Sequence, residues 1–460
     1  MNTTPRFAIT GHPNKGKSSI VATLAEDESV AISDVPGTTG ETRVYPMCMD
    51  GETLYELVDT PGFQRAREVL EWLKVRVSTA VDRHAAVADF VVLHRSDPRF
   101  HVECELLQPI IEGAGILYVV DGARPYGPEY ECEMQILQWT GQPRMALINL
   151  IGGDEHVQSW QRALDQYFSV VRVFDAQRAD FNKRIELLDA FATLRESWSD
   201  SIQRAIEVLK TNRVQRLNQA ASEIADLLLS VMCMQETAPL PDDEADSQLQ
   251  ALLAERLQDR IRDREKQSYD LLQQICGHSG LSRSIDEMPL LQEDLFSEQS
   301  FVLFGLSNTQ LALTGAASGA IAGGGVDMLV GGASFFLGAG IGALLGGVGV
   351  LIGARQIAGV EIMGMPMGGY QLEVGPVANP NFPWVVLGRA ILFFRLVSER
   401  NHARRESLIV TAKTTDSLSE SLGHRQRVRL HNIFISIRKR HNISHEDHNQ
   451  LIAQLAALCK

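Results

Sequence analysis

Hydrophobic positions alternate between strand-like and helix-like patterns through the first part of the chain. Short apolar runs such as RFAIT, GILYVVD and RMALIN are separated by amphipathic segments such as FQRAREVLEWLK. Two further alternating runs lie at Thr42–Asp50 and Thr53–Asp59. This succession is typical of an α/β fold with a mostly parallel sheet. A helical run over Arg184–Trp198 is expected to close this domain, which we place at residues 1–198.

A helical period dominates the next part of the chain. Apolar residues recur with heptad-like spacing from Asp200 to Val231, and a second charged amphipathic segment covers Leu249–Cys276. The acidic, proline-containing stretch between them predicts a linker near 236–248. We therefore expect a helical stalk over 199–300, packed within the chain or paired with another chain.

The stretch from Leu313 to Arg355 is apolar and rich in glycine, with a single ionisable residue, Asp327, in its interior. On a helix, glycines at such spacing form a smooth strip that a second backbone can approach closely. We predict a glycine-zipper hairpin over 301–360. The glycines of its two ladders are Gly315, Gly319 and Gly323, then Gly338, Gly342 and Gly346, continued by Gly349 and Gly353.

Two environments for this hairpin stay open. No residue from Met328 to Ala354 is charged, and this length exceeds the ~20 apolar residues that cross a bilayer. One prediction is therefore membrane association through residues 311–355. The alternative is a soluble hairpin sheltered by the two long amphipathic helices, because glycine costs about 1 kcal/mol relative to alanine in a helix.

The last part of the chain, residues 361–460, is predicted to be a basic helical segment. It opens with the β-like run GYQLEVGP and continues in two helical stretches, WVVLGRAILFFRLVSERNHARRE and HRQRVRLHNIFISIRKRH. Arginines beside apolar residues suit a surface helix on anionic lipid. They equally suit an RNA backbone, or a helix face that is simply solvated.

Length, charge and cysteine usage narrow the class of protein. A chain of 460 residues is long enough for two or three domains. Its net charge is −14, so the basic tail stands out against an acidic remainder. The six cysteines form no CxxC pair, which argues against a zinc knuckle or disulfide framework and favours a reducing cytosol. The N-terminus lacks the order of a signal peptide.

Candidate chemistry begins with Gly11-x4-Gly16-Lys17-Ser18, a phosphate-loop pattern that follows a strand and opens a helix. The glycines let backbone N–H groups point at phosphate oxygens, and the helix adds the positive end of its dipole. Lys17 is expected on the β- and γ-phosphates and Ser18 on Mg²⁺.

Two downstream motifs predict a nucleotide switch. VPGTTGETR contains Thr39, which can close over the metal, and VDTPG contains Asp59 and Gly62. Asp59 can bind Mg²⁺ through water, and the Gly62 N–H can reach the γ-phosphate. Lys17, Thr39 and Gly62 are therefore the predicted catalytic set, and Ser18, Thr39 and Asp59 the predicted Mg²⁺ set.

The motifs GHPNKGKSS, PGTT and DTPG resemble those of the translation-factor-related GTPases of the TrmE, Era and EngA group. The resemblance covers about residues 6 to 180 and implies GTP and Mg²⁺ as ligands. It also implies that Asn14 holds K⁺, unless Asn14 only shapes the loop, and that Phe63 stands where other GTPases carry a water-orienting glutamine. The loop residues expected at the nucleotide are Gly11, Asn14, Lys15, Gly16, Lys17, Ser18 and Ser19.

The base-reading motif departs from the family pattern. In INLIGGD, Asn149 is in register, but Leu150 replaces the lysine and Asp154 lies two residues late. An aspartate reads guanine by accepting two hydrogen bonds, so its displacement leaves GTP, ATP or loose specificity open. In VFDAQ, Ala176 is the residue expected to lend its backbone N–H to the base.

The span from Phe63 to Gly115 is longer than a minimal G domain needs, and we expect it to enlarge the nucleotide-responsive region. Its histidines and cysteine match no regular metal template. The whole arrangement resembles a bacterial family that joins such a G domain to a glycine-rich tail.

The leading hypothesis is a GTPase switch that controls a membrane-associated glycine-zipper region at the inner face of the cytoplasmic membrane. The alternatives are an RNA-linked GTPase in ribosome assembly or tRNA modification, and a nucleotide-controlled scaffold that forms homo-oligomers.

Overall fold

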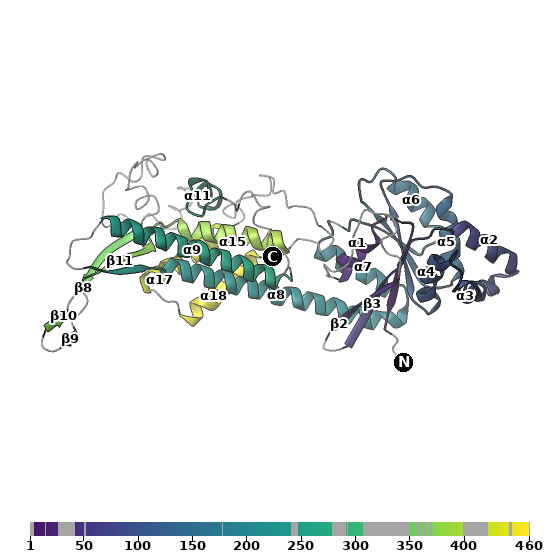
Figure 1. The fold of residues 1–460 in the computed structure, drawn as a ribbon, viewed down its shortest axis with the longest axis horizontal. Helices are drawn as coiled ribbons and strands as arrows, with labels where there is room; N and C mark the ends of the chain where they lie inside the picture. Colours follow the sequence, from purple (N-terminus) through teal and green to yellow (C-terminus); the bar gives the residue numbers. More distant parts are fainter. Residues whose placement is uncertain are drawn as a thin grey trace. The chain divides into compact units, whose positions relative to one another are not determined.

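The computed structural model describes residues 4–13, 15–25, 42–49, 52–176, 178–240, 247–277, 291, 293–306, 350–356, 360–362, 365–367, 370–398, 422–440 and 444–459. The chain forms two compact units that divide between Asn212 and Arg213 (Figure 1). The limits predicted for four domains stay a prediction.

The N-terminal unit is built on a six-stranded sheet in the order β2-β3-β1-β4-β5-β6. All neighbouring strands are parallel except β2 and β3, which form an antiparallel pair. This arrangement confirms the predicted α/β class. The strands are β1 (Arg6–Thr10), β2 (Arg43–Met49), β3 (Glu52–Asp59), β4 (Gly115–Asp121), β5 (Arg144–Asn149) and β6 (Val170–Phe174).

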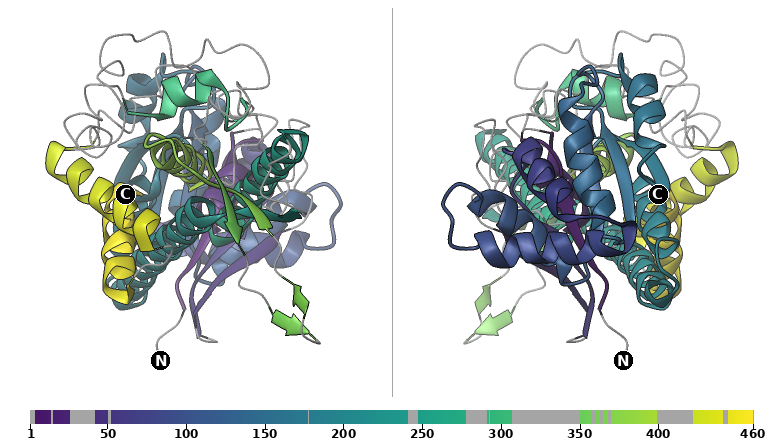
Figure 2. Two further views of the ribbon diagram at one scale, coloured as in Figure 1. Left: turned by 90° about the vertical axis from the view of Figure 1, so that its left-hand side faces the viewer. Right: turned by 90° about the vertical axis from the view of Figure 1, so that its right-hand side faces the viewer.

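Helices cover both faces of this sheet (Figures 1 and 2). Alternate residues of the central strands supply two cores, because side chains in a strand point to opposite faces. Phe7 and Leu117 enter one core with Phe191 and Trp198, while Tyr118 enters the other. The helices are α1 (Lys17–Ala25), α2 (Ala66–Arg76), α3 (Arg83–His94), α4 (His101–Ile111), α5 (Glu129–Trp139), α6 (Val157–Leu164) and α7 (Phe181–Ala192), with short 3₁₀ turns at Ala80–Asp82 and Glu196–Trp198.

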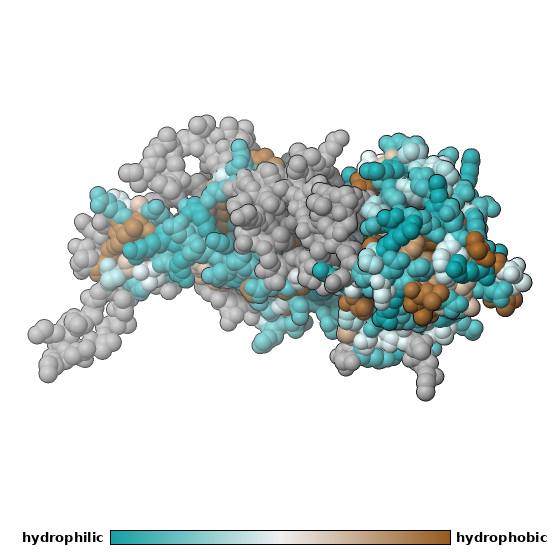
Figure 3. Space-filling model, turned by 45° about the vertical axis from the view of Figure 1, so that its right-hand side comes forward, coloured by the Kyte–Doolittle hydropathy of each residue, from teal (hydrophilic) through white to brown (hydrophobic). Residues whose placement is uncertain are grey.

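The long span after Phe63 folds as α2, α3 and α4, which pack in the same core. His84 bonds the Thr140 carbonyl oxygen, and His94 packs on Phe90. Among the described residues, no group of three His, Cys, Asp or Glu side chains could hold a metal. The visible surface of this unit is mainly hydrophilic, with isolated apolar patches (Figure 3). Its exposed apolar side chains include Val75, Val81, Val92 and Leu93.

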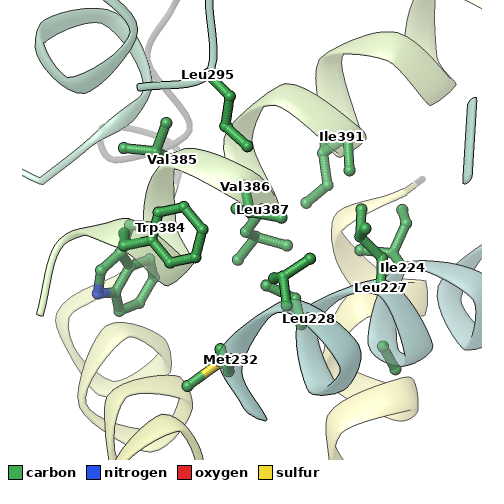
Figure 4. Packing of buried hydrophobic residues seen from close by; sticks show 14 of the residues in the cluster. Ile224, Leu227, Leu228, Met232, Leu295, Trp384, Val385, Val386, Leu387 and Ile391 are labelled. Atoms are coloured by element: carbon green, nitrogen blue, oxygen red, sulfur yellow. The ribbon is translucent and has the colours of Figure 1, made fainter. Parts of the chain in front are cut away.

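The C-terminal unit combines long helices with a three-stranded antiparallel sheet in the order β7-β11-β8. Residues of α8 from Leu217 onward share one core with residues of α9 and α15. Figure 4 shows the part of this core around Leu228 of α8 and Val386 of α15. The first part of α8 (Ser199–Cys233), up to Asn212, belongs to the N-terminal unit, and the rest belongs to this one. The other elements are β7 (Glu236–Leu240), α9 (Ser247–Ile275), α11 (Glu298–Phe304), β8 (Val350–Gln356), β9 (Val360–Ile362), β10 (Met365–Met367), β11 (Tyr370–Val377), α15 (Phe382–Ser398), α17 (His424–Arg440) and α18 (His445–Leu458).

Two predictions for this unit are corrected. The expected linker near 236–248 begins with strand β7, which pairs with β11 from Glu236 to Leu240. The end of the expected helical hairpin, Val350–Gln356, is strand β8, which includes Gly353 and Arg355 and pairs with the other edge of β11. Residues 307–349, with the rest of both glycine ladders, lie outside the described residues. No helix within the described ranges is long and apolar enough to cross a membrane.

A third correction concerns α15, which was expected on the surface. Nearly all of its residues from Phe382 to Phe394 are buried. Arg389 is 3% exposed, and its guanidinium contacts both carboxylate oxygens of Glu265 on α9, at 2.7 and 3.2 Å. A helix that is apolar all round belongs in a core. Arg389 can be buried there because Glu265 supplies the partner that its charge requires.

Candidate functional site

The loop between β1 and α1 has the backbone shape that the phosphate-loop pattern predicts. Gly11 and Gly16 have φ values of +136° and +77°, which L side chains rarely adopt. A Cβ atom on Gly11 would lie 2.4 Å from the Val119 carbonyl oxygen, and one on Gly16 would lie 2.3 Å from Nδ2 of Asn149. Both positions therefore require glycine.

Lys17 is enclosed by this loop. Its ammonium donates to the carbonyl oxygens of Gly11, at 3.3 Å, and His12, at 3.1 Å. Burial lowers the pKa of Lys17 to about 8, and the negative charge of Asp59 only partly opposes this shift. A desolvated cation inside a ring of backbone groups is suited to phosphate oxygens.

Ser18 and Asp59 lie together at the start of α1 and the end of β3. The Ser18 hydroxyl donates to Oδ2 of Asp59 at 2.9 Å. The register of β1 with β3, which pairs Ile9 with Asp59, brings the two together. A hydroxyl and a carboxylate are hard oxygen donors, which fit Mg²⁺. Thr39 and Asn14, predicted for Mg²⁺ and K⁺, lie outside the described residues.

The DTPG turn lies against the phosphate loop. A Cβ atom on Gly62 would lie 2.6 Å from the Pro13 nitrogen and 2.8 Å from the Gly11 carbonyl oxygen. The preceding Thr60 hydroxyl donates to the Ile9 carbonyl oxygen at 2.8 Å. Phe63 is 1% exposed and fills the core beneath α2, so its side chain cannot orient water.

Asn149 links the phosphate loop to the loop after β6. Its Nδ2 donates to the Lys15 carbonyl oxygen at 3.2 Å, and its Oδ1 accepts the Ala176 N–H at 3.1 Å. The Ala176 N–H, predicted to reach the base, is thus directed at Asn149. Asp154 is exposed, and its carbonyl oxygen accepts the N–H of Val157.

The Lys15 side chain turns away from the predicted phosphate position. Its ammonium is 3.8 Å from Oδ2 of Asp121 and 5.8 Å from the centre of the Tyr130 ring. Burial lowers the pKa of Lys15, and Asp121 opposes this effect. Ser19 lies in the first turn of α1, where its carbonyl oxygen accepts the Thr23 hydroxyl.

A further buried carboxylate, Glu133 on α5, was missed by the sequence reasoning. It contacts Nδ1 of His12 at 2.9 Å and accepts the Tyr118 hydroxyl at 2.8 Å. Burial, reinforced by Glu133, raises the pKa of Tyr118 well above its ordinary value. The available signal was a glutamate on the apolar face of α5, between Tyr130 and Leu137.

The chain matches two protein families. Residues 161–457 match "Domain of unknown function (DUF3482)" and residues 6–149 match "50S ribosome-binding GTPase". GTPase Der of Azoarcus sp. (strain BH72) is 28% identical over 218 residues, which is 47% of this chain and 43% of that protein. GTPase Der of Caldanaerobacter subterraneus subsp. tengcongensis is 35% identical over 94 residues, 20% of this chain and 19% of that protein.

Among solved structures, a variant of Era from Aquifex aeolicus bound to GDP.AlF4- is similar to the chain. The sequence identity is 14% and the TM-score 0.29, over 60% of this chain and 90% of that chain. The chain spans about a fifth of the length of the first curated relatives that it matches.

Proposed function

The chain belongs to the family of the domain of unknown function DUF3482, and on this premise we propose that its N-terminal unit binds GTP with Mg²⁺ and hydrolyses it as a conformational switch. The observation that carries this proposal is the buried Lys17 in a strand–loop–helix turn beside the Ser18–Asp59 pair. The match of residues 6–149 to the 50S ribosome-binding GTPases supports the same chemistry.

In this mechanism the chain supplies positioning and charge. Loop N–H groups and Lys17 hold the β- and γ-phosphates, and Ser18 and Asp59 would hold Mg²⁺, which neutralises charge on those phosphates when bound. The Gly62 N–H then meets the γ-phosphate, so loss of that phosphate frees the DTPG turn. Because Phe63 is buried, the attacking water is oriented by another group.

Guanine selectivity belongs to the proposal, and nucleotide binding tests it. Purified full-length protein is titrated with GTP, ATP and XTP, with Lys17→Ala as the control. We expect GTP to bind most tightly and Lys17→Ala to lose binding. Binding by Lys17→Ala that equals wild type would contradict the assignment of the phosphate site.

An Asp154→Asn variant tests base reading directly. If Asp154 accepts from guanine N1–H and N2, the variant should lose affinity for GTP and gain affinity for XTP. Unchanged preference would assign base reading to another group. Turnover compared in KCl and NaCl tests the K⁺ role of Asn14, and equal rates would exclude that role.

We further propose that nucleotide state controls the association of the glycine-rich region with the cytoplasmic face of a membrane. The uncharged run within residues 311–355 supports this, although its last residues form β8. The second candidate, an RNA-linked function at the ribosome, is favoured by the family match of residues 6–149. Pelleting that resists carbonate supports the first, and ribosome co-sedimentation abolished by ribonuclease supports the second.

A further inference from the structure

Helix α4 is hydrogen-bonded to two segments next to the predicted nucleotide site: the residues after the DTPG turn, and Thr42 at the start of β2. One tie comes from the Glu103 carboxylate to the residues after the DTPG turn. The other comes from the Glu105 carbonyl oxygen to Thr42, three residues after Thr39. We propose that α4 couples these two segments and that Glu103 is a positioning residue for GTP hydrolysis. This inference rests on the proposed GTPase function.

Glu103 holds the beginning of α2. Its Oε1 accepts the backbone N–H groups of Gln64, at 2.9 Å, and Arg65, at 2.6 Å. Arg65 is the N-cap of α2 and makes no side-chain cap of its own, so Glu103 supplies the cap from a distant helix. The negative charge also suits the positive end of the α2 dipole.

The surroundings of Glu103 make this contact specific. The side chain is 0% exposed, and its second oxygen, Oε2, has no hydrogen-bond partner among the described residues. Burying a carboxylate away from water costs free energy unless its oxygens accept hydrogen bonds. Here Oε1 accepts from the two N–H groups. Gly62 lies two residues before Gln64 and is pressed against Pro13 and Gly11. Glu103 therefore fixes where the Gly62 N–H points.

The second tie depends on a proline inside α4. Pro109 has no N–H group, so the Glu105 carbonyl oxygen, four residues earlier, lacks its usual helical donor. The Thr42 hydroxyl donates to that oxygen at 3.1 Å. The proline thus keeps an acceptor available for the residue at which the chain enters β2.

The two ties come from residues two apart in one helix, so a shift of either segment displaces the same element. Helix α4 in turn packs on α3. The ring of Phe100, the N-cap of α4, lies 5.3 Å from the ring of Phe90 between centroids, and Sγ of Cys104 lies 3.9 Å from the Val91 carbonyl oxygen. A γ-phosphate that draws in Thr39 and Gly62 should therefore move α4 and α3 together.

Steady-state GTP turnover by the full chain tests the proposal. Glu103→Ala should lower kcat by at least about tenfold, because a displaced reacting group costs rate rather than affinity, and leave KM near wild type. Glu103→Gln keeps one acceptor oxygen and should retain an intermediate kcat. Glu71→Gln, at an exposed position of α2, is the matched control and should match wild type.

Two further variants keep the test decisive if Glu103→Ala does not fold. Thr42→Val should also lower kcat. Pro109→Ala restores an N–H that competes for the Glu105 carbonyl oxygen, so it should lower kcat in the same direction while stabilising the helix. The double variant should be no slower than Thr42→Val, since both act on one contact.

Hydrogen exchange gives a readout that a purely structural role would not move. Exchange in residues 101–111 should differ between GDP and a non-hydrolysable GTP analogue in wild type, and this difference should shrink in Glu103→Gln and Thr42→Val. If wild type hydrolyses GTP but folded Glu103→Ala and Thr42→Val keep its kcat, the coupling role is wrong. If wild type itself neither binds nor hydrolyses GTP, the proposed function fails instead.

Discussion

The protonation of Lys17 leads to a quantitative prediction about nucleotide binding. Burial lowers the pKa of this ammonium to about 8, against an ordinary value of 10.5. By this value the free protein carries the charge on about nine molecules in ten at pH 7 and on about one in ten at pH 9. Bound phosphates add negative charge beside the ammonium and favour its charged form. Binding above pH 8 should therefore take up a proton.

The magnitude follows from linkage. Affinity should fall by about tenfold between pH 7 and pH 9, or about 1.4 kcal/mol, because the protein must first be protonated at the higher pH. The folding stability of the nucleotide-free protein should change with pH in the opposite direction. A lysine with a lowered pKa destabilises the fold below that pKa, so stability should rise by up to about 3 kcal/mol as pH increases from 8 to 10.5.

Isothermal titration calorimetry in buffers of different ionisation enthalpy measures the proton uptake. We expect close to zero protons per GTP at pH 7 and about one at pH 9. Lys15 is the neighbouring amine whose pKa burial also lowers, so Lys15→Met serves as the control and should keep the uptake. Equal proton uptake at both pH values would refute the assignment of a depressed pKa to Lys17.

Three other predictions follow from buried contacts. Asn149→Ala should lower GTP affinity by about tenfold or more, since it removes the two hydrogen bonds through which Asn149 joins the phosphate loop at Lys15 to the loop after β6 at Ala176; wild-type affinity in a binding titration would contradict this. Arg389→Met should destabilise the C-terminal unit by about 3–5 kcal/mol, because it leaves the buried Glu265 carboxylate without its cationic partner; hydrogen exchange in residues 382–398 at increasing urea concentration measures the loss, and Arg389→Met with Glu265→Met should recover much of it. Gly16→Ala should abolish nucleotide binding, because its Cβ would meet Asn149 and its φ is positive; retained binding in a filter assay would show that the loop can rearrange.

The backbone shape of the predicted phosphate loop could be inferred from the sequence because short motifs determine it. Gly11 and Gly16 set the turn, and Lys17 and Ser18 follow at fixed positions on the next helix. Asp59 needed only the strand order, since it ends the strand beside β1. The structure places these residues together, and their roles at the nucleotide, like those assigned to Thr39, Asn14 and Asp154, stay predictions.

The strands of the C-terminal unit could not be predicted from spacing. Glycines four residues apart fit a helix, but VLIGARQ is also a competent strand, and its partner β11 begins fourteen residues after it ends. The same holds for β7, which includes Pro239 and reads as a linker until β11 is placed beside it. Pairing between strands distant in sequence decided both cases, and propensity did not.

The ties of α4 were beyond the sequence for a related reason. Glu103 lies 39 residues from Gln64, and Thr42 lies 63 residues from Glu105. The sequence placed a responsive region between Phe63 and Gly115 but could not name its contacts. A proline inside a helical pattern was the visible signal, because it leaves one carbonyl without its helical donor.

In each of the two units, some buried charged residues lie at helix positions that are otherwise apolar. Four such residues are buried and have apolar or aromatic neighbours three or four residues away in the chain: Glu103, Glu133, Glu265 and Arg389. Such a residue must find a hydrogen-bonding partner, since an unpaired buried charge is costly. The sequence therefore indicates that a partner exists but not which one, because the partner lies on another element. In the N-terminal unit those partners are the α2 N-terminus and the phosphate loop, so the same physical requirement that holds a core together also places charge beside the nucleotide site.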